Sequence, residues 1–127
     1  AWKDRPNAVT VAAAARWGFR RLAVVSTGNH GAAAAAYCAA AGLGCVVFCH
    51  PDAPPGLVAL MRRYGAEVVP THAGAEGVAA ELARGDTFPG TTLDPTPGFT
   101  NPFGVEGFKT IAFEVVDQLG RVPDRVY

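Results

Sequence analysis

Leu22-Ala23-Val24-Val25-Ser26-Thr27-Gly28-Asn29-His30-Gly31 is a short apolar run that passes directly into a turn of polar residues and glycines. A segment rich in alanine follows and predicts a helix. An apolar run that does not alternate with polar residues is typical of a strand covered on both faces. The stretch therefore predicts a buried strand, a tight turn and a helix, in that order.

The same arrangement occurs three times along the chain. Each copy has an apolar run that predicts a helix, then a glycine, then a short run of β-branched residues, and the copies are Ala12 to Ser26, Ala34 to His50 and Leu57 to His72. The glycines at positions 18, 42 and 65 are expected just after the helices, because glycine adopts the left-handed conformation that ends them.

Helices alternating with strands predict an α/β fold. We expect an open three-layer αβα domain whose sheet is mostly parallel, with right-handed crossovers. The expected strands are residues 22–25, 45–48 and 67–69. A further helix is expected at about 75–84, then a loop from Gly85 to Pro102, and a last helix at roughly 105–119 that ends at Gly120.

The composition is that of a single ordinary domain. The chain has 127 residues, of which 50% are hydrophobic and 17% are charged, and its formal net charge is zero. Zero net charge does not favour binding to nucleic acid or to an acidic membrane surface, and no apolar run is long enough to span a bilayer. The ends look cut, since the chain opens without methionine and closes on a turn that enters an unfinished strand, so we expect an internal piece of a longer protein.

Three cysteines, Cys38, Cys45 and Cys49, are odd in number and lack a CxxC spacing. We expect them to be buried, reduced thiols of a cytoplasmic protein. A zinc site made from Cys49, His50 and His72 has no convincingly spaced further ligand, so no metal is expected. His30 is expected to belong to the turn.

The turn after the first expected strand is a candidate anion site. Ligands of open parallel sheets bind beyond the carboxyl ends of the strands, and here Ser26, Thr27 and Asn29 would stand beside the free amide groups of a helix N-terminus. Such a set suits a carboxylate or a phosphate. The alternative is an ordinary helix cap, but a cap needs only one such residue. We favour a ligand site.

Lys3-Asp4-Arg5 near the start of the chain, then Ser26-Thr27-Gly28-Asn29-His30-Gly31, and later Asn101-Pro102-Phe103 are motifs that occur in the same order in fold-type II pyridoxal-phosphate (PLP) enzymes, which this chain resembles. The resemblance is greatest to the threonine synthase family, with threonine and serine dehydratases next, and it covers nearly the whole chain. The segments that carry it are Lys3-Asp4-Arg5, Ser26-Thr27-Gly28-Asn29-His30-Gly31, Gly42 to Phe48, Arg63 to Val69, Asn101-Pro102-Phe103, Val105 to Glu114 and Val122-Pro123-Asp124.

The resemblance implies roles for individual residues. Lys3 matches the lysine to which the family attaches PLP and which then moves protons at the substrate carbons. Asn29 matches the asparagine that hydrogen-bonds the 3′-oxygen of the cofactor. Ser26 and Thr27, together with Asn29, match the loop that holds the α-carboxylate of an amino-acid substrate. PLP itself supplies the electron sink.

One departure concerns the substrate. Threonine synthases usually place an arginine that grips the substrate phosphate where this chain has Gly104, which removes a bidentate contact. Lys109 is the candidate to compensate, as a point charge. Two smaller departures are Trp2, where the family usually has phenylalanine, and Pro6, where glycine is common.

The resemblance implies a PLP-dependent carbon–oxygen lyase that converts O-phosphohomoserine to threonine and phosphate by β,γ-replacement. Two alternatives remain: β-elimination by a threonine or serine dehydratase to give a 2-oxo acid, and a non-catalytic α/β domain that binds a small anion. We expect residues 1–28 and 105–127 to join a larger PLP domain, residues 29–104 to form a smaller mobile one, and the full-length protein to be a homodimer.

Overall fold

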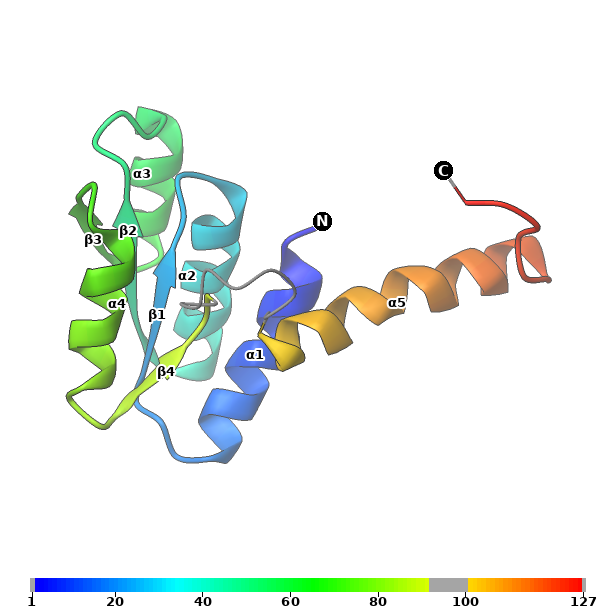
Figure 1. Cartoon of the computed structure of the whole chain (residues 1–127), viewed down its shortest axis with the longest axis horizontal. Helices are drawn as coiled ribbons and strands as arrows, with labels where there is room; N and C mark the ends of the chain where they lie inside the picture. Colours follow the sequence, from blue (N-terminus) through cyan, green and yellow to red (C-terminus); the bar gives the residue numbers. More distant parts are fainter. Residues whose placement is uncertain (1, 92–100, 127) are drawn as a thin grey trace.

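The computed structural model describes residues 2–91 and 101–126 (Figure 1). These ranges hold five helices and four strands, with the order α1 (Asp4–Arg16), β1 (Arg21–Val25), α2 (Asn29–Ala41), β2 (Gly44–Cys49), α3 (Pro55–Arg63), β3 (Glu67–Pro70), α4 (Gly74–Leu82), β4 (Thr87–Pro89) and α5 (Pro102–Leu119). None of these helices is long and apolar enough to cross a membrane.

The four strands form one parallel sheet in the order β3-β2-β1-β4. Side chains of α1, α2 and α3 pack on one face of the sheet, and Val78 of α4 packs on the other. The fold is therefore the open αβα arrangement with a parallel sheet that the alternation of elements predicts. All four carboxyl ends lie at the same edge, where ligands of such sheets bind.

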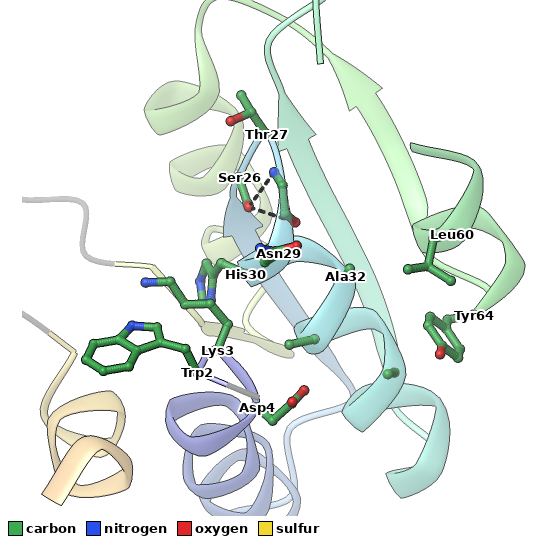
Figure 2. Close-up of a pocket in the computed structure, with 13 residues that line it drawn as sticks. Trp2, Lys3, Asp4, Ser26, Thr27, Asn29, His30, Ala32, Leu60 and Tyr64 are labelled. Atoms are coloured by element: carbon green, nitrogen blue, oxygen red, sulfur yellow. Dashed lines mark hydrogen bonds between the residues drawn. The ribbon is translucent and has the colours of Figure 1, made fainter. Parts of the chain in front are cut away.

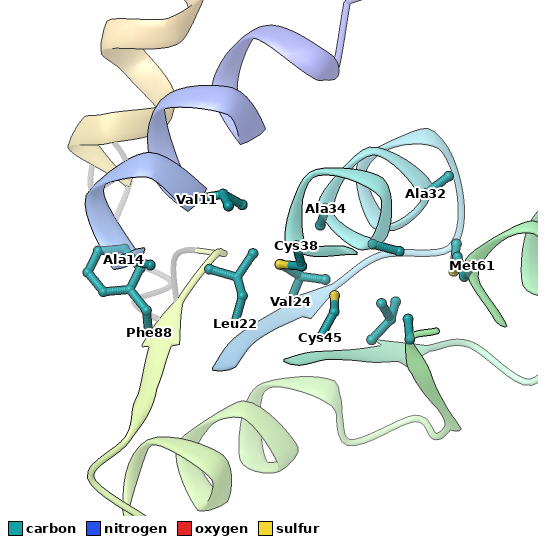
Figure 3. Packing of buried hydrophobic residues seen from close by; sticks show 13 residues of the cluster. Val11, Ala14, Leu22, Val24, Ala32, Ala34, Cys38, Cys45, Met61 and Phe88 are labelled. Carbon is teal, nitrogen blue, oxygen red and sulfur yellow. The ribbon is translucent and has the colours of Figure 1, made fainter. Parts of the chain in front are cut away.

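The main core lies between the sheet and the helices α1 to α3 (Figure 3). Leu22 and Val24 point into it from β1 and Met61 from α3, and each of these side chains is fully buried. Ala23 points the opposite way, toward α4. Burying one such large side chain contributes roughly 1.5–3 kcal/mol to stability. These residues therefore fix the position of β1, and with it the turn that follows the strand.

The expected helix ends are confirmed. Gly18, Gly42, Gly65 and Gly120 all have positive φ, between 68° and 84°. All three cysteines are free and buried, as expected. A hydrogen bond with the neighbouring Cys38 thiol, and then burial, raise the pKa of Cys45.

The expected loop from Gly85 to Pro102 is wrong in part, because it contains a strand. Thr87, Phe88 and Pro89 pair with β1 as the edge strand β4. Three residues with a proline carry almost no strand signal in sequence, and proline is tolerated only at such an edge. Residues 92–100 lie outside the described part of the chain.

The last helix begins at Pro102, earlier than expected. The Asn101 side chain caps it, since its Oδ1 accepts hydrogen bonds from the amides of Phe103 (3.0 Å) and Gly104 (3.3 Å). Its Nδ2 donates to Thr10 Oγ1 of α1 (3.1 Å), so the cap also joins α5 to α1. Beyond this contact α5 extends away from the sheet (Figure 1).

Candidate active site

The turn after β1 is organised by a single hydroxyl group. Ser26 Oγ accepts hydrogen bonds from the amides of Gly28 (3.2 Å) and Gly31 (2.9 Å), which closes the turn at the start of α2 (Figure 2). Ser26 therefore caps α2, because its oxygen accepts from an amide of the first helical turn, although Ser26 itself lies outside the helix. Its oxygen is occupied within the turn, so the structure gives this residue a structural task beside the predicted contact with a substrate carboxylate.

Asn29 and Thr27 are left exposed by this arrangement. Asn29 is the first residue of α2, and the cap position before it is Gly28, which makes no side-chain cap bond. Asn29 is therefore not the cap of α2, whereas Ser26 has the capping role that the alternative of a capped helix start expects. The amides of Asn29 and His30 belong to the first helical turn, where an amide has no partner within its own helix and favours an anion.

Lys3 comes to this turn because α1 packs against α2. It occupies the cap position of α1, and its Nζ lies over the ring of Phe108 from α5, at 5.4 Å from the ring centroid. The ring of Trp2 also contacts Phe108, with a centroid distance of 5.3 Å. Helices α1 and α5 thus hold the lysine between them at the carboxyl edge of the sheet.

The larger cavity at this edge has a volume of about 600 Å³. It is lined by residues from α1, the turn, α2 and α3: Trp2, Lys3, Asp4, Ser26, Thr27, Gly28, Asn29, His30, Ala32, Ala33, Ala36, Leu60 and Tyr64. The structure thus brings Lys3, Ser26, Thr27 and Asn29 to one cavity, although Lys3 is separated from the others by a helix and a strand.

A smaller cavity of about 240 Å³ adjoins the same lysine. Its walls come from α1, β4 and α5, and the described residues that line it are Lys3, Pro6, Thr10, His30, Gly90, Thr91, Asn101, Gly104, Val105 and Phe108. Lys3 and His30 are the two described residues common to both cavities. The site therefore has two parts, with these two side chains at their junction.

His30 is half-buried and held from two sides. Its Nδ1 lies 3.0 Å from Asn7 Nδ2, and its Nε2 lies 3.4 Å from Thr91 Oγ1. Burial and then the nearby charge of Lys3 lower the pKa of His30, while a hydrogen bond with the Gly90 backbone acts in the opposite direction. His30 is therefore a neutral imidazole near neutral pH.

Lys109 is not brought to either cavity. Its Nζ lies 2.5 Å from Glu106 Oε1, one turn earlier on the exposed side of α5. Gly104, in contrast, lines the smaller cavity. A Cβ atom at Gly104 would meet its nearest neighbour at 3.6 Å, an ordinary van der Waals contact, so a Cβ atom fits there.

His50 and His72 lie side by side, with ring centroids 4.5 Å apart, at the ends of β2 and β3. Residues 2–91 and 101–126 contain no group of three or more His, Cys, Asp or Glu side chains that could hold a metal ion. Neither histidine lines either of the two cavities around Lys3.

Sequence reasoning missed Asn7, Thr10, Thr91 and Tyr64 as parts of the site. Asn7 and Thr10 are polar members of the buried face of α1, and Asn7 stands one turn after Lys3. That spacing places both on the same side of a helix, so it was a usable signal. Thr91 had no such signal, because it follows a strand that the sequence does not indicate.

The larger cavity fits a cofactor of the size and charge of PLP. Its volume is within the range of small-molecule sites, and the alanines at positions 32, 33 and 36 leave a flat wall on α2 against which a planar ring could lie. Lys3 offers an amine, Asn29 a side-chain amide, and the α2 N-terminus an electropositive end.

Comparison with known proteins agrees with this geometry. The family model described as "Pyridoxal-phosphate dependent enzyme" matches residues 1–127. The chain is 39% identical over 130 residues to a threonine synthase of Halalkalibacterium halodurans, covering 97% of this chain and 34% of that protein. It is 38% identical to a threonine synthase of Methanocaldococcus jannaschii, covering 98% of this chain and 31% of that protein.

Solved structures show the same fold. A pyridoxal 5′-phosphate-dependent aspartate racemase superimposes with a TM-score of 0.75 at 25% identity, covering 92% of this chain and 36% of that one. Diaminopropionate ammonia lyase of Escherichia coli superimposes with a TM-score of 0.78 at 18% identity, covering 94% and 39%. The chain spans about a third of the length of these relatives. On the family match over its whole length, and on the fold, the chain belongs to the pyridoxal-phosphate-dependent enzymes.

Proposed function

We propose that the full-length protein is a PLP-dependent carbon–oxygen lyase of the threonine synthase type. The reaction would convert O-phosphohomoserine and water to threonine and phosphate. One observation carries the proposal: Lys3 and Asn29 line the same cavity in a chain that is 39% identical to a threonine synthase.

Bound PLP would supply the electron sink for charge that develops on the substrate carbons. The residues of this chain would do the rest. Lys3 would anchor the cofactor through its amine and carry protons between substrate carbons, a task for which its place at the junction of both cavities is suited. Asn29 would orient the cofactor ring through its amide. Thr27, with the first amides of α2, would hold the substrate carboxylate.

We further propose that residues 1–28 and 105–127 join a larger domain of a cytoplasmic homodimer, and that residues 29–104 form the smaller, mobile domain. Apolar side chains on the outer part of α5 and just after it support the part of this proposal that places residues 105–127 against a larger domain, since Phe113, Leu119 and Val122 are each more than half exposed among the described residues. Large apolar side chains in such a group are typical of a surface that other protein covers.

Gly104 favours the second candidate, elimination from threonine or serine to give a 2-oxo acid. No arginine or lysine other than Lys3 lines the smaller cavity among the described residues. A substrate with a hydroxyl group in place of a phosphate would find Thr10, Thr91 and Asn101 there, which are neutral hydrogen-bonding partners.

Borohydride reduction of the full-length protein, followed by peptide mapping, tests the assignment of Lys3. We expect a pyridoxyl group on Lys3 and none on Lys109. Lys3→Ala should retain at most loosely bound cofactor and lose turnover by several orders of magnitude. Lys109→Ala is the matched control, because it removes an exposed lysine that lies outside both cavities. A tag on Lys109, or on neither lysine, would contradict the proposal.

Phosphate release and 2-oxo-acid formation, measured side by side on the same preparation, separate the two candidate reactions. Phosphate release from O-phosphohomoserine with little 2-oxo acid supports replacement. Formation of 2-oxo acid from threonine or serine, with little phosphate release, supports elimination.

A further inference from the structure

We propose that Asn7 is a positioning residue: its amide holds His30 as the uncharged imidazole that carries hydrogen on Nε2, and ties that ring to the backbone of Lys3. The inference deepens the proposed function, since Lys3 is the residue to which the cofactor would attach. It rests on the hydrogen bonds of a buried amide.

Asn7 is almost completely buried, with 1% of its surface exposed. Its Nδ2 donates to the carbonyl oxygen of Lys3 at 2.7 Å and lies 3.0 Å from Nδ1 of His30. An amide nitrogen carries two hydrogens, so it can serve both partners at once. One side chain thus joins the main chain of Lys3 to the ring of His30.

The amide can be oriented in one way only. With the amide turned over, Asn7 Oδ1 would face the Lys3 carbonyl at about hydrogen-bond distance, and two acceptors would repel each other. In the observed orientation Asn7 Oδ1 is buried without a partner among the described residues, which is destabilising. The two donated hydrogen bonds therefore decide the orientation, although the amide oxygen is left unsatisfied.

This orientation selects one form of His30. Nδ1 faces a donor, so it must be an unprotonated acceptor, and the single ring hydrogen is then on Nε2, which faces Thr91 Oγ1. A protonated ring would place an N–H against the N–H of Asn7. Hydrogen bonding to the neutral form thus disfavours the charged one, in the same direction as burial and the charge of Lys3.

The charge state of His30 determines the charge beside Lys3, where the two cavities meet. Lys3 and Asp4 are the charged residues of α1 that line the larger cavity with His30, and Thr91 on its other side is uncharged. A protonated His30 would put a second cation beside the Lys3 amine. A neutral His30 avoids this repulsion and presents an N–H toward Thr91, whose Oγ1 also accepts from the Val25 amide at 3.0 Å. The hydroxyl hydrogen of Thr91 is then the group that can donate toward the smaller cavity.

Nitrogen NMR of the full-length protein with labelled histidine tests the inference without any substrate. The His30 signals are assigned with a His30→Gln variant. We expect the neutral ring with hydrogen on Nε2 at neutral pH, and a change of charge at lower pH than for an ordinary histidine. In Asn7→Asp a carboxylate replaces the donor, and the pKa of His30 should rise by about one unit or more. Asn7→Ala should fall between the two, because it only removes the donor.

The pH dependence of kcat, measured on the enzyme with its cofactor bound, is a second test. In Asn7→Asp the acid limb of kcat should move to higher pH, with a smaller change in KM, because His30 then becomes charged within the working range. The control is Thr87→Val, which alters another buried polar side chain. Thr87 is the first residue of β4, so it lies at the amino edge of the sheet, opposite the carboxyl edge that holds His30. This variant should lower stability while leaving both the His30 signals and the acid limb unchanged.

Three results would overturn the inference: hydrogen on Nδ1 in the wild-type ring, ordinary titration of the wild-type His30, or the same His30 pKa in the wild type, Asn7→Ala and Asn7→Asp. If Asn7→Asp does not fold, the comparison of Asn7→Ala with the wild type decides alone. The test is separable from that of the proposed function, because the His30 signals can be recorded and compared among the variants whether or not Lys3 takes up a pyridoxyl group.

Discussion

Ser26 and Asn29, three residues apart in the turn after β1, have different roles. Ser26 uses its hydroxyl oxygen to accept two amide hydrogen bonds, so it shapes the turn. Asn29 stands one turn later with an exposed side chain, so it is available to a ligand. A residue type that suits a ligand also suits a cap, and only the positions of the amides distinguish the two.

Substitutions at these two positions should separate the tasks. We expect Asn29→Ala to change the visible absorbance of the bound cofactor and to lower kcat. The free energy of unfolding should stay within about 0.5 kcal/mol of the wild-type value, as is usual for an exposed site. Ser26→Ala should instead lower the free energy of unfolding by about 0.5–2 kcal/mol, as the loss of a cap does. The measurements are an absorbance spectrum, steady-state rates and denaturant unfolding. Wild-type spectra and rates for Asn29→Ala would contradict the assigned role.

Gly104 is the residue where substrate preference can be changed. It has an ordinary negative φ and room for a Cβ atom, so arginine can enter without backbone strain. A new bidentate contact with phosphate is worth on the order of 2–3 kcal/mol, or roughly thirty- to more than a hundredfold in affinity. We therefore expect Gly104→Arg to lower the KM for O-phosphohomoserine more than the KM for threonine or serine.

Efficient turnover of O-phosphohomoserine with a low KM by the unmodified protein would contradict this role of Gly104. That result would show that a group other than a residue at position 104 holds the phosphate. An unchanged KM in Lys109→Ala would exclude Lys109 as that group, so Lys109→Ala and Gly104→Arg are measured together.

At the scale of elements, the crossing of α1 and α5 is the contact that places Lys3. The crossing is close because Gly107 faces the backbone of α1, where an added Cβ would lie 2.6 Å from the Cα of Pro6. Arg5 strengthens it by donating to Thr110 Oγ1 (2.7 Å) and Glu114 Oε1 (2.6 Å), and this pairing lowers the pKa of Glu114. The close approach needs glycine, because the neighbouring atoms are backbone and cannot move aside alone.

Gly107→Ala should therefore push α5 away from α1. We expect a loss of about 1–3 kcal/mol in the free energy of unfolding, the usual cost of overpacking, together with weaker retention of the cofactor as Lys3 shifts. Gly56→Ala in α3 is the matched control, since a Cβ there meets nothing within 4 Å. It should be neutral, or stabilising by up to about 1 kcal/mol. Equal stability of the two variants by denaturant unfolding would show that the crossing is not tight.

At the scale of the whole molecule, the outer part of α5 leaves large apolar side chains exposed among residues 2–91 and 101–126. Phe113 is 67% exposed and Leu119 54% exposed, and the helix extends away from the sheet (Figure 1). The chain corresponds to about a third of its curated relatives. These two facts support the proposal that a larger domain covers α5 in the full-length protein.

Phe113→Ala in the full-length protein tests that coverage. If other parts of the protein bury the ring, the substitution should lower the free energy of unfolding by about 3–5 kcal/mol. If the ring stays exposed, the change should be within about 0.5 kcal/mol. Gln118→Ala, at an exposed polar position of the same helix, should have little effect in either case. A small effect of Phe113→Ala would contradict the proposed domain division.

The sequence by itself determined the α/β class, three of the strands, the glycines that end the helices, and the family through its lysine and asparagine motifs. These features depend on neighbours along the chain: side-chain periodicity, turn conformation and short motifs. The tertiary structure alone decided that β4 completes the sheet, that Lys109 lies outside both cavities around Lys3, and that Asn7 joins Lys3 to His30. The reason is physical, because an edge strand, the lining of a cavity and the partner of a buried amide depend on which atoms packing brings together, and those atoms come from segments far apart in the chain.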